Sequence, residues 1–589
     1  MRSRNVTKLL TLVVTLFMLF GIVGCQTTTP ATSPTSASSP TAATTPTVAP
    51  LEKVSLTMGW GGYSSIDHPY WPSEFMTNMM TELNIELTLE NLANDKLTLA
   101  LAGGDLPDLL NISQSKYTQQ LLDGNLVVAM DDYLDQYGIN IKKNTVRNDI
   151  IRKFFSNGTG KLYFHTPESG TDNAALAVQP WNGFNIRWDL YKQIGAPVMK
   201  TDDDYIAALK QMQALNPTTE TGDPVYGMGV HNDWGLWGWC VRSIANGGFT
   251  GVAGYSYMQD PVTNDLINNY MDSSSPFWKD MTFFWKMNQA GLLDPDSFTM
   301  KGADLIAKAE KGQYLGNYYN GWFGGYYNAN LATDPTTIKG GFMPIPYEGS
   351  YVASGGTTLA GWDNQMLMVT SSCKNIERAI MVIDYQDSPE GNRAFWSGEE
   401  GKQYTIEGGK AVLNPTAMAD RGAANEAWMK TGIGGYGDDW GVIIGYTGST
   451  IAPDGLPYDL FSSDRASIIA GLNTLQKDFC SFYKVEIPSD LVKNMIKAGT
   501  VKDQSSILSN MTACMEPVSD DIKTIDARVL ETVLKAIPTI VMAEDYDAFL
   551  AARTQLQADL RAAGADESWA AWQAVWGPAK EFVEGLLKK

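Results

Sequence analysis

The sequence predicts an α/β fold, because it contains a strand–helix–strand pattern, a helix that ends at glycines, and enough residues for several domains. Residues 54–58 and 85–89 alternate apolar and polar side chains, and a helical pattern over 71–83 lies between them. This order predicts a parallel sheet. A further helix over 96–102 precedes a short apolar strand at 109–110. More than 530 residues follow the first fifty, which predicts two or three domains.

The N-terminus has the pattern of a signal peptide over residues 1–24. Basic residues within the first eight positions precede an apolar run. This run is shorter than the roughly 20 apolar residues that a permanent membrane helix needs. The tetrapeptide 22–25 resembles the bacterial lipobox, in which the cysteine is acylated after cleavage just before it. Cys25 is therefore expected to become a lipid-bearing N-terminus, which would hold the protein at the extracytoplasmic face of the cell membrane.

Residues 25–50 are expected to form a tether between the lipid and the folded chain. From Gln26 onwards they are almost wholly Thr, Ser, Ala and Pro, without a single charge. Such a composition cannot form a core. A coil or polyproline chain of this length reaches roughly 30 to 80 Å.

The composition favours an uncharged solute. Hydrophobic residues make up 44% of the chain, so it is globular, and its formal net charge is −21. A binder of phosphates needs a basic face, so nucleic acid is not expected as a partner.

The cysteines and histidines do not predict a metal or a cofactor. The histidines lie far apart, and no pair of cysteines has the spacing of a zinc site. The four cysteines after Cys25 are expected to be free and buried, with one or two disulfides as the alternative. They are Cys240, Cys373, Cys480 and Cys514.

No catalytic constellation stands out, so the protein is not expected to be an enzyme. A glycosidase needs two carboxylates that face each other across a cleft. The chain has many acids, but nothing selects a pair. A surface-anchored glycoside hydrolase stays an alternative.

Aromatic residues are the unusual feature of this sequence. Many lie beside Gly, Asn, Asp or Pro, which places them in loops, and the densest example is 316–328. Flat rings stack on the apolar faces of sugars and amides bond their hydroxyl groups, although aromatic residues are also common in cores. The loop tryptophans include Trp60, Trp71, Trp181, Trp234, Trp237, Trp239, Trp322, Trp362, Trp396 and Trp440.

Residues 103–108, with the pattern Gly-Asp-x-Pro-Asp between a helix and a strand, resemble a family. This family is the family 1 extracellular solute-binding proteins, in which the pattern lies at a similar distance from the N-terminus. Further similar segments follow in the same order along the chain. They are 124–134, the expected strand at 160–163, 185–201 with its helix through Leu209, 375–385 and 389–391.

The resemblance implies a periplasmic-binding-protein-like fold of type II, with two α/β lobes and a ligand cleft between them. One lobe is expected at 51–178 plus 362–450, and the other at 179–361 plus 451–589. Connections between the lobes are expected near 177–180 and 358–361. Binding at the ends of strands agrees with the general rule for open parallel sheets.

The resemblance also implies a function and a set of contacts. The expected function is to capture a neutral oligosaccharide, as a monomer, and deliver it to the permease subunits of an ABC transporter. A peptide or another polar solute is the alternative ligand. Loops after strands supply the ligand contacts in this family. The expected contacts are Trp60, Trp181, Trp322, Trp362, Asn320 and Asp363.

Many members of this family carry a calcium loop, and the sequence departs from that pattern. The corresponding residues 216–223 hold too few carboxylates for the usual set of about six to eight oxygen ligands. Asp294 and Asp296 form a second candidate, but Phe298 and Met300 occupy positions that ligands would need. No metal is therefore expected.

Overall fold

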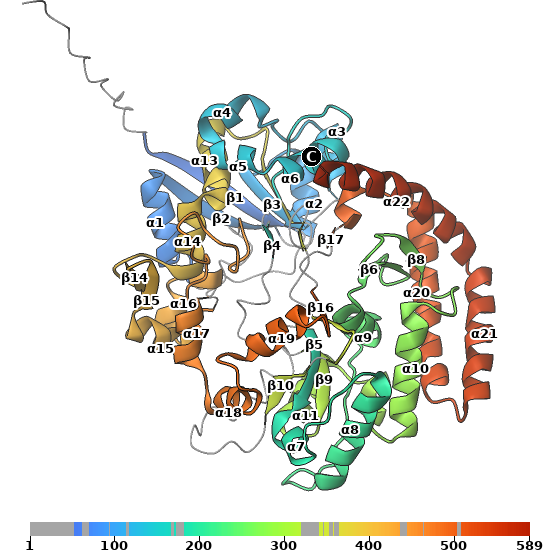
Figure 1. Cartoon of the computed structure of the whole chain (residues 1–589). Helices are drawn as coiled ribbons and strands as arrows, with labels where there is room; N and C mark the ends of the chain where they lie inside the picture. Colours follow the sequence, from blue (N-terminus) through green and yellow to red (C-terminus); the bar gives the residue numbers. More distant parts are fainter. Residues whose placement is uncertain are drawn as a thin grey trace, which may run out of the picture. The chain divides into compact units, whose positions relative to one another are not determined.

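A computed structural model describes most of the chain after residue 51 (Figure 1). All described residues belong to the compact unit Glu52–Lys589. They are residues 52–61, 70–92, 95–113, 117–166, 170–171, 182–319, 341–345, 347–352, 357–358, 365–435, 445–462, 464–503, 508–509 and 511–588.

The first sheet has four strands in the order β13-β3-β1-β2. Strands β1 (Val54–Gly61), β2 (Ile85–Leu92) and β3 (Leu109–Ser113) are parallel, and β13 (Gln365–Val369) is antiparallel to β3. The strand–helix–strand prediction is therefore confirmed. Helix α1 (Glu74–Glu82) begins later than predicted because the Ser73 side chain accepts a hydrogen bond from the Met76 amide and caps the helix.

Apolar side chains on the first sheet form one hydrophobic core with the helices around it. Leu56, Met58 and Leu110 come from the strands, and Ile380 and Ile383 come from α13 (Ile376–Asp387). Helix α2 (Asp95–Gly103) and helix α6 (Thr145–Phe154) contribute Leu97 and Ile151 to the same core.

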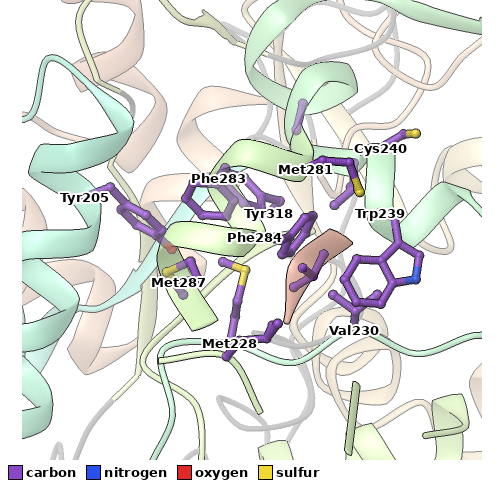
Figure 2. Close-up of a cluster of buried hydrophobic side chains, with 14 of the residues drawn as sticks. Tyr205, Met228, Val230, Trp239, Cys240, Met281, Phe283, Phe284, Met287 and Tyr318 are labelled. Carbon is purple, nitrogen blue, oxygen red and sulfur yellow. The ribbon is translucent and has the colours of Figure 1, made fainter. Parts of the chain in front are cut away.

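The second sheet has the order β10-β5-β9 and a separate core. Strand β5 (Asn182–Arg187) is antiparallel to both β9 (Gly316–Tyr319) and β10 (Phe342–Pro344). Figure 2 shows Phe283 and Phe284 of α10 (Pro276–Gln289) among side chains of α8 (Asp202–Leu215), α9 (Trp237–Gly247) and β9. The Trp239 and Phe284 rings meet edge to face with their centroids 5.0 Å apart.

Three long helices end the chain: α20 (Asp520–Val541), α21 (Tyr546–Ala562) and α22 (Ala565–Leu587). Helix α20 packs on α10, and its apolar face belongs to the core of the second sheet. Helix α22 instead reaches α6, where Ile150, Val583 and Leu586 share a third core (Figure 1). Because Ile150 and Ile151 are neighbours on α6, this helix takes part in both the first and the third core.

Short strands pair the segments that lead from one sheet to the other. Strands β4 (Gly170–Thr171), β12 (Thr357–Thr358) and β17 (Leu508–Ser509) form a sheet in the order β17-β12-β4. Strand β11 (Tyr351–Val352) pairs with β16 (Lys502–Asp503). One expected connection, 177–180, lies outside the described residues, and the other overlaps β12 at Thr358. The paired segment at 502–509 was not predicted.

The remaining elements are small. The 3-10 helices are η1 (Asp131–Tyr133), η2 (Pro295–Phe298), η4 (Ile433–Gly435) and η5 (Met511–Cys514). The strands are β6 (Thr250–Val252), β7 (Tyr257–Gln259), β8 (Leu266–Asn268), β14 (Tyr404–Glu407) and β15 (Lys410–Leu413). The helices are α3 (Thr118–Asp123), α4 (Leu134–Tyr137), α5 (Ile139–Lys143), α7 (Trp188–Gln193), α11 (Gly302–Glu310), α14 (Pro389–Ser397), α15 (Pro415–Ala423), α16 (Glu426–Met429), α17 (Arg465–Gly471), α18 (Thr474–Tyr483) and α19 (Pro488–Lys497).

Two further observations concern cysteines and the membrane. Cys240, Cys373, Cys480 and Cys514 are all buried and form no disulfide with one another, as predicted. Within the described ranges, every helix is too short or too polar to be a candidate for spanning a membrane.

Candidate ligand-binding site

The carboxyl ends of the parallel strands define one edge of the first sheet. Strands β1, β2 and β3 end there at Gly61, Leu92 and Ser113, and the antiparallel β13 begins there at Gln365. Ligands of open α/β sheets bind outside such an edge. Trp362 and Asp363 come shortly before β13 in the chain but lie outside the described residues, so their assignment as ligand contacts stays a prediction.

Trp60 lies at this edge, between Asn91 of β2 and Asn111 of β3. Only 4% of its surface is exposed, and the side chain belongs to the core of the first sheet. The next residue, Gly61, is also closely packed, because a Cβ there would lie 2.9 Å from a Leu97 methyl group, which would have to move. The indole is therefore firmly packed where the strand ends, and its role as a ligand contact stays a prediction.

The second sheet has an edge at which β5 begins and β9 ends. Asn182, the first residue of β5, pairs with Tyr319, the last residue of β9. Trp181 precedes this pair in the chain and Asn320 follows it. Trp181, Asn320 and Trp322 lie outside the described residues, so they too stay predicted contacts.

A cluster of aromatic side chains follows an extended segment beside β9. Tyr226 forms a parallel bridge with Tyr314 of the chain that enters β9, and the Gly316 amide donates to the Gly227 carbonyl at 2.8 Å, whereas Met228 bridges Leu293. The segment then leads into His231, Trp234 and Trp237, which we call the aromatic cluster. The Trp234 ring lies edge to face with the other two, at centroid distances of 4.9 Å to His231 and 5.0 Å to Trp237.

Exposure distinguishes Trp234 from its neighbours. It is 36% exposed, more than any other tryptophan that the structure describes. His231 is buried, and this burial lowers the pKa of its imidazole below the ordinary value, so the ring is neutral near pH 7. The sequence placed Trp234, Trp237 and Trp239 in loops but did not select them as contacts. Trp234 does lie in a turn, whereas the prediction is wrong for Trp237 and Trp239, which belong to α9. The glycine between Trp234 and Trp237, Gly235, indicates a turn and could have identified Trp234 as a candidate contact.

Charged side chains fix the helix that begins at the aromatic cluster. Arg242 of α9 pairs with Asp202, and its Nη1 also donates to buried Asp280 at 3.2 Å. The Tyr347 hydroxyl donates to Asp202 at 3.0 Å, and the Ser243 hydroxyl donates to Asp280 at 2.6 Å. Burial raises the pKa of Asp280 to about 7, although the Arg242 charge opposes this shift. These bonds join α9 to α8, α10 and the segment that follows β10.

The two calcium candidates are both satisfied by protein groups. Around 216–223, Thr221 donates to Asp223 at 2.6 Å, and the Asp223 amide donates to Thr219 at 3.1 Å. In the second candidate the Lys308 ammonium bonds Asp294 at 2.8 Å and Asp296 at 2.7 Å. The described residues contain no group of three acidic, histidine or cysteine side chains arranged to hold a metal ion.

The comparisons with known proteins agree with this architecture. Residues 81–393 match the family model of the bacterial extracellular solute-binding proteins, and the chain therefore belongs to that family. The predicted resemblance is confirmed. Members of this family bind solutes, and the family name indicates an extracytoplasmic location. A search of curated proteins by sequence finds no match.

Several solved structures share the fold at low sequence identity. The Streptococcus pneumoniae ABC-transporter substrate-binding protein FusA in complex with kestose is 13% identical, with a TM-score of 0.55 over 91% of this chain and 99% of its own. An HMO-binding solute-binding protein from Bifidobacterium longum infantis ATCC 15697 is 13% identical, with a TM-score of 0.56 over 90% and 99%. The alginate-binding protein AlgQ2 without calcium ion is 16% identical, with a TM-score of 0.54 over 89% and 98%. The predicted α/β fold of the two-lobe solute-binding class is thereby confirmed.

Proposed function

We propose that this solute-binding protein captures a neutral oligosaccharide and delivers it to the permease subunits of an ABC transporter. The match over residues 81–393 to a solute-binding family is the observation that carries the proposal. Proteins of the same fold include one in complex with kestose and one described as HMO-binding. The net charge of −21 favours an uncharged ligand over an anionic one.

The proposal includes a place for the protein at the membrane. An acyl chain on Cys25 would hold the monomeric protein at the outer face of the membrane, after removal of residues 1–24. The uncharged residues 25–50 would let the folded unit reach the permease.

The proposed ligand position is between two lobes, with the boundaries that the sequence predicts. The edge at Gly61, Leu92 and Ser113 supports one side of this position, and the edge at Asn182 and Tyr319 supports the other. The proposed contacts remain Trp60, Trp181, Trp322, Trp362, Asn320 and Asp363.

We propose binding without catalysis. The family and the similar structures are binding proteins, which supports this part of the proposal. The protein would therefore release an oligosaccharide with its chain length unchanged.

A thermal-shift screen tests the proposal, because a ligand that binds only the folded state stabilises it by RT ln(1 + [L]/Kd). Neutral oligosaccharides, uronic-acid oligosaccharides and peptides are the three arms. We expect a shift from a neutral oligosaccharide, which chromatography then recovers intact. A shift from peptides alone would contradict the choice of ligand, and shortened sugars would contradict binding without catalysis.

A further inference from the structure

The aromatic cluster lies where a ligand of this fold is expected, on residues that were not among the predicted contacts. The segment 226–230 and β9 point to the same edge, so the chain beyond Val230 leads toward the edge at which β5 begins. In Figure 1, α9, which starts at Trp237, lies beside β5, and contacts between the two elements agree with this view.

Backbone hydrogen bonds support the turn that carries the cluster. The Gly235 amide donates to the Asn232 carbonyl at 3.0 Å, which closes a turn directly after Trp234. The Asp233 carboxylate accepts the Gly302 amide at 2.7 Å and so attaches this turn to the start of α11. The indole of Trp234 is therefore presented on a turn that is closed by its own backbone and bonded to a neighbouring helix.

The exposure of the indole is unusual for its surroundings. Trp237 is half-buried and His231 is 3% exposed, whereas Trp234 keeps 36% of its surface open although both rings pack against it. An exposed aromatic ring on a fixed turn leaves apolar area uncovered, which a ligand with an apolar face can cover.

We infer that Trp234, supported by His231 and Trp237, is a ligand contact that stacks on the apolar face of a sugar ring. This inference rests on the proposed oligosaccharide function and adds a residue to the same site. The three rings bring no positive charge near pH 7, which suits an uncharged sugar ring rather than a uronic acid.

The support for the cluster comes from the network behind it. Arg242 binds carboxylates of two other helices, and α9 is thereby held against α8 and α10. A rigid platform loses little conformational entropy when a ligand binds, so most of the contact area contributes to affinity.

The test compares Trp234→Ala and Trp234→Phe with the wild type on a glycan array, followed by titration of the retained glycan. Covering about 50 Å² of ring is worth roughly a tenfold change in affinity, so Trp234→Ala should raise Kd roughly tenfold. Trp234→Phe keeps a ring and should recover most of this loss. Tyr546→Ala is the matched control, because Tyr546 is 50% exposed on α21 and should leave Kd unchanged.

A second measurement does not depend on affinity. N-bromosuccinimide oxidises accessible indoles, and mass spectrometry locates the product. In the wild type, the glycan retained on the array should protect Trp234 from oxidation, whereas an equal concentration of a glycan that is not retained should not.

The outcomes separate the inference from the proposed function. If the wild type binds a glycan, while Trp234→Ala stays within twofold and Trp234 is not protected, the contact is overturned and oligosaccharide binding stands. If the wild type binds peptides and no glycan, the proposed function and the contact both fall. A tenfold loss that Trp234→Phe restores, together with protection, establishes the contact.

Discussion

His165, Asp387 and Arg147 are buried side chains that contact one another. His165 Nε2 lies 3.6 Å from an Asp387 carboxylate oxygen, and Arg147 pairs with the same carboxylate. Arg147 also donates to the Thr166 carbonyl at 3.3 Å, shortly before the chain enters the segment that contains β4. Burial, which outweighs the attraction of Asp387, lowers the pKa of His165 from 6.5 to about 3.

This shift predicts an acid sensitivity that depends on one residue. The unfolded chain binds a proton at His165 below pH 6.5, but the folded protein does not bind it until the pH approaches 3. Keeping His165 neutral therefore costs the folded protein no stability above pH 6.5. Below pH 6.5 the free energy of unfolding decreases as the pH falls toward 3. Between pH 7.5 and 5.0 the free energy of unfolding should fall by about 2 kcal/mol through this group.

Urea unfolding at the two pH values measures this contribution. The loss between pH 7.5 and 5.0 should be about 2 kcal/mol smaller in His165→Gln than in the wild type. The comparison uses the pH dependence rather than the absolute stability, so a general loss of stability in the variant does not affect it. Equal losses in both proteins would show that the pKa of His165 is the same in the folded and unfolded states.

Lys308 gives a second prediction at the scale of single residues. Its ammonium bonds Asp294, whose side chain has no exposed surface, so Lys308→Met leaves a buried carboxylate without its cation. We expect a loss of about 3 kcal/mol of unfolding free energy. Lys580→Met is the matched control: Lys580 has a similar exposure but pairs with Asp265, which is 63% exposed, so the loss should stay below about 1 kcal/mol.

The same site predicts how metal removal affects the wild type. Since the described calcium candidates are bonded to protein groups, EGTA and added calcium should both leave the midpoint of thermal unfolding unchanged. A calcium-dependent shift of several degrees would contradict this expectation and would point to ligands among residues outside the described ranges.

At the scale of elements, strongly patterned segments were predictable and short paired segments were not. The helix from Thr201 through Leu209 was predicted from the family resemblance, and the structure has α8 at Asp202–Leu215, capped by a capping box between Thr201 and Asp204. Strands β4, β12 and β17 have only two residues each, so no periodicity marks them. Their pairing comes from distant parts of the chain, which no local pattern encodes.

The candidate site shows the same division. Alternation predicted a strand over 54–58, and Trp60 was expected in a loop beyond it. This placement is wrong, because β1 continues to Gly61 and Trp60 lies inside the strand near its carboxyl end. The predicted strand at 160–163 is instead an isolated bridge just beyond that range, between His165 and Leu367. The Trp234 cluster was not selected, because its position depends on the parallel bridge between Tyr226 and the chain that enters β9, and single sequences do not reveal alignment between distant segments.

The contact between α6 and α22 is testable as a unit. The Phe154 and Phe582 rings lie edge to face, 5.4 Å apart at an angle of 89°. A double-mutant cycle with Phe154→Ala and Phe582→Ala should give a coupling energy of about 1 kcal/mol, since the ring pair is lost in either single variant. Additive losses would show that α22 does not rest on α6 in solution.

At the scale of the whole molecule, the first prediction concerns membrane attachment. Cys25→Ser should prevent acylation, so the protein should be released from membranes or remain unprocessed, while its thermal unfolding stays unchanged. Cell fractionation and the mass of the N-terminal peptide measure this outcome. Cys480→Ser is the control, because that cysteine is a free thiol in the folded part and should leave fractionation unchanged. A fully cleaved Cys25→Ser variant that stayed on membranes would contradict the anchor.

The second prediction concerns the response of the whole molecule to ligand. Two lobes that share a ligand can close around it only if the ligand binds the closed form more tightly. Small-angle scattering should show a smaller radius of gyration when a bound oligosaccharide is added, with an unchanged far-UV circular dichroism spectrum. A constant radius at saturating ligand would mean that closure does not accompany binding.

The pairing of β13 with β3 has a consequence for the order of folding. Residues 114–364 separate these two neighbouring strands of the first sheet, so β3 remains an open edge during synthesis until β13 emerges. Long-range pairing of this kind makes folding slow. In pulse-labelled hydrogen exchange during refolding, the amides of Met366 and Met368, which alternate with Leu367 and face β3, should gain protection late and together with the β3 amides that pair with them. The first sheet, which begins with β1, is therefore complete only after β13 has paired with β3.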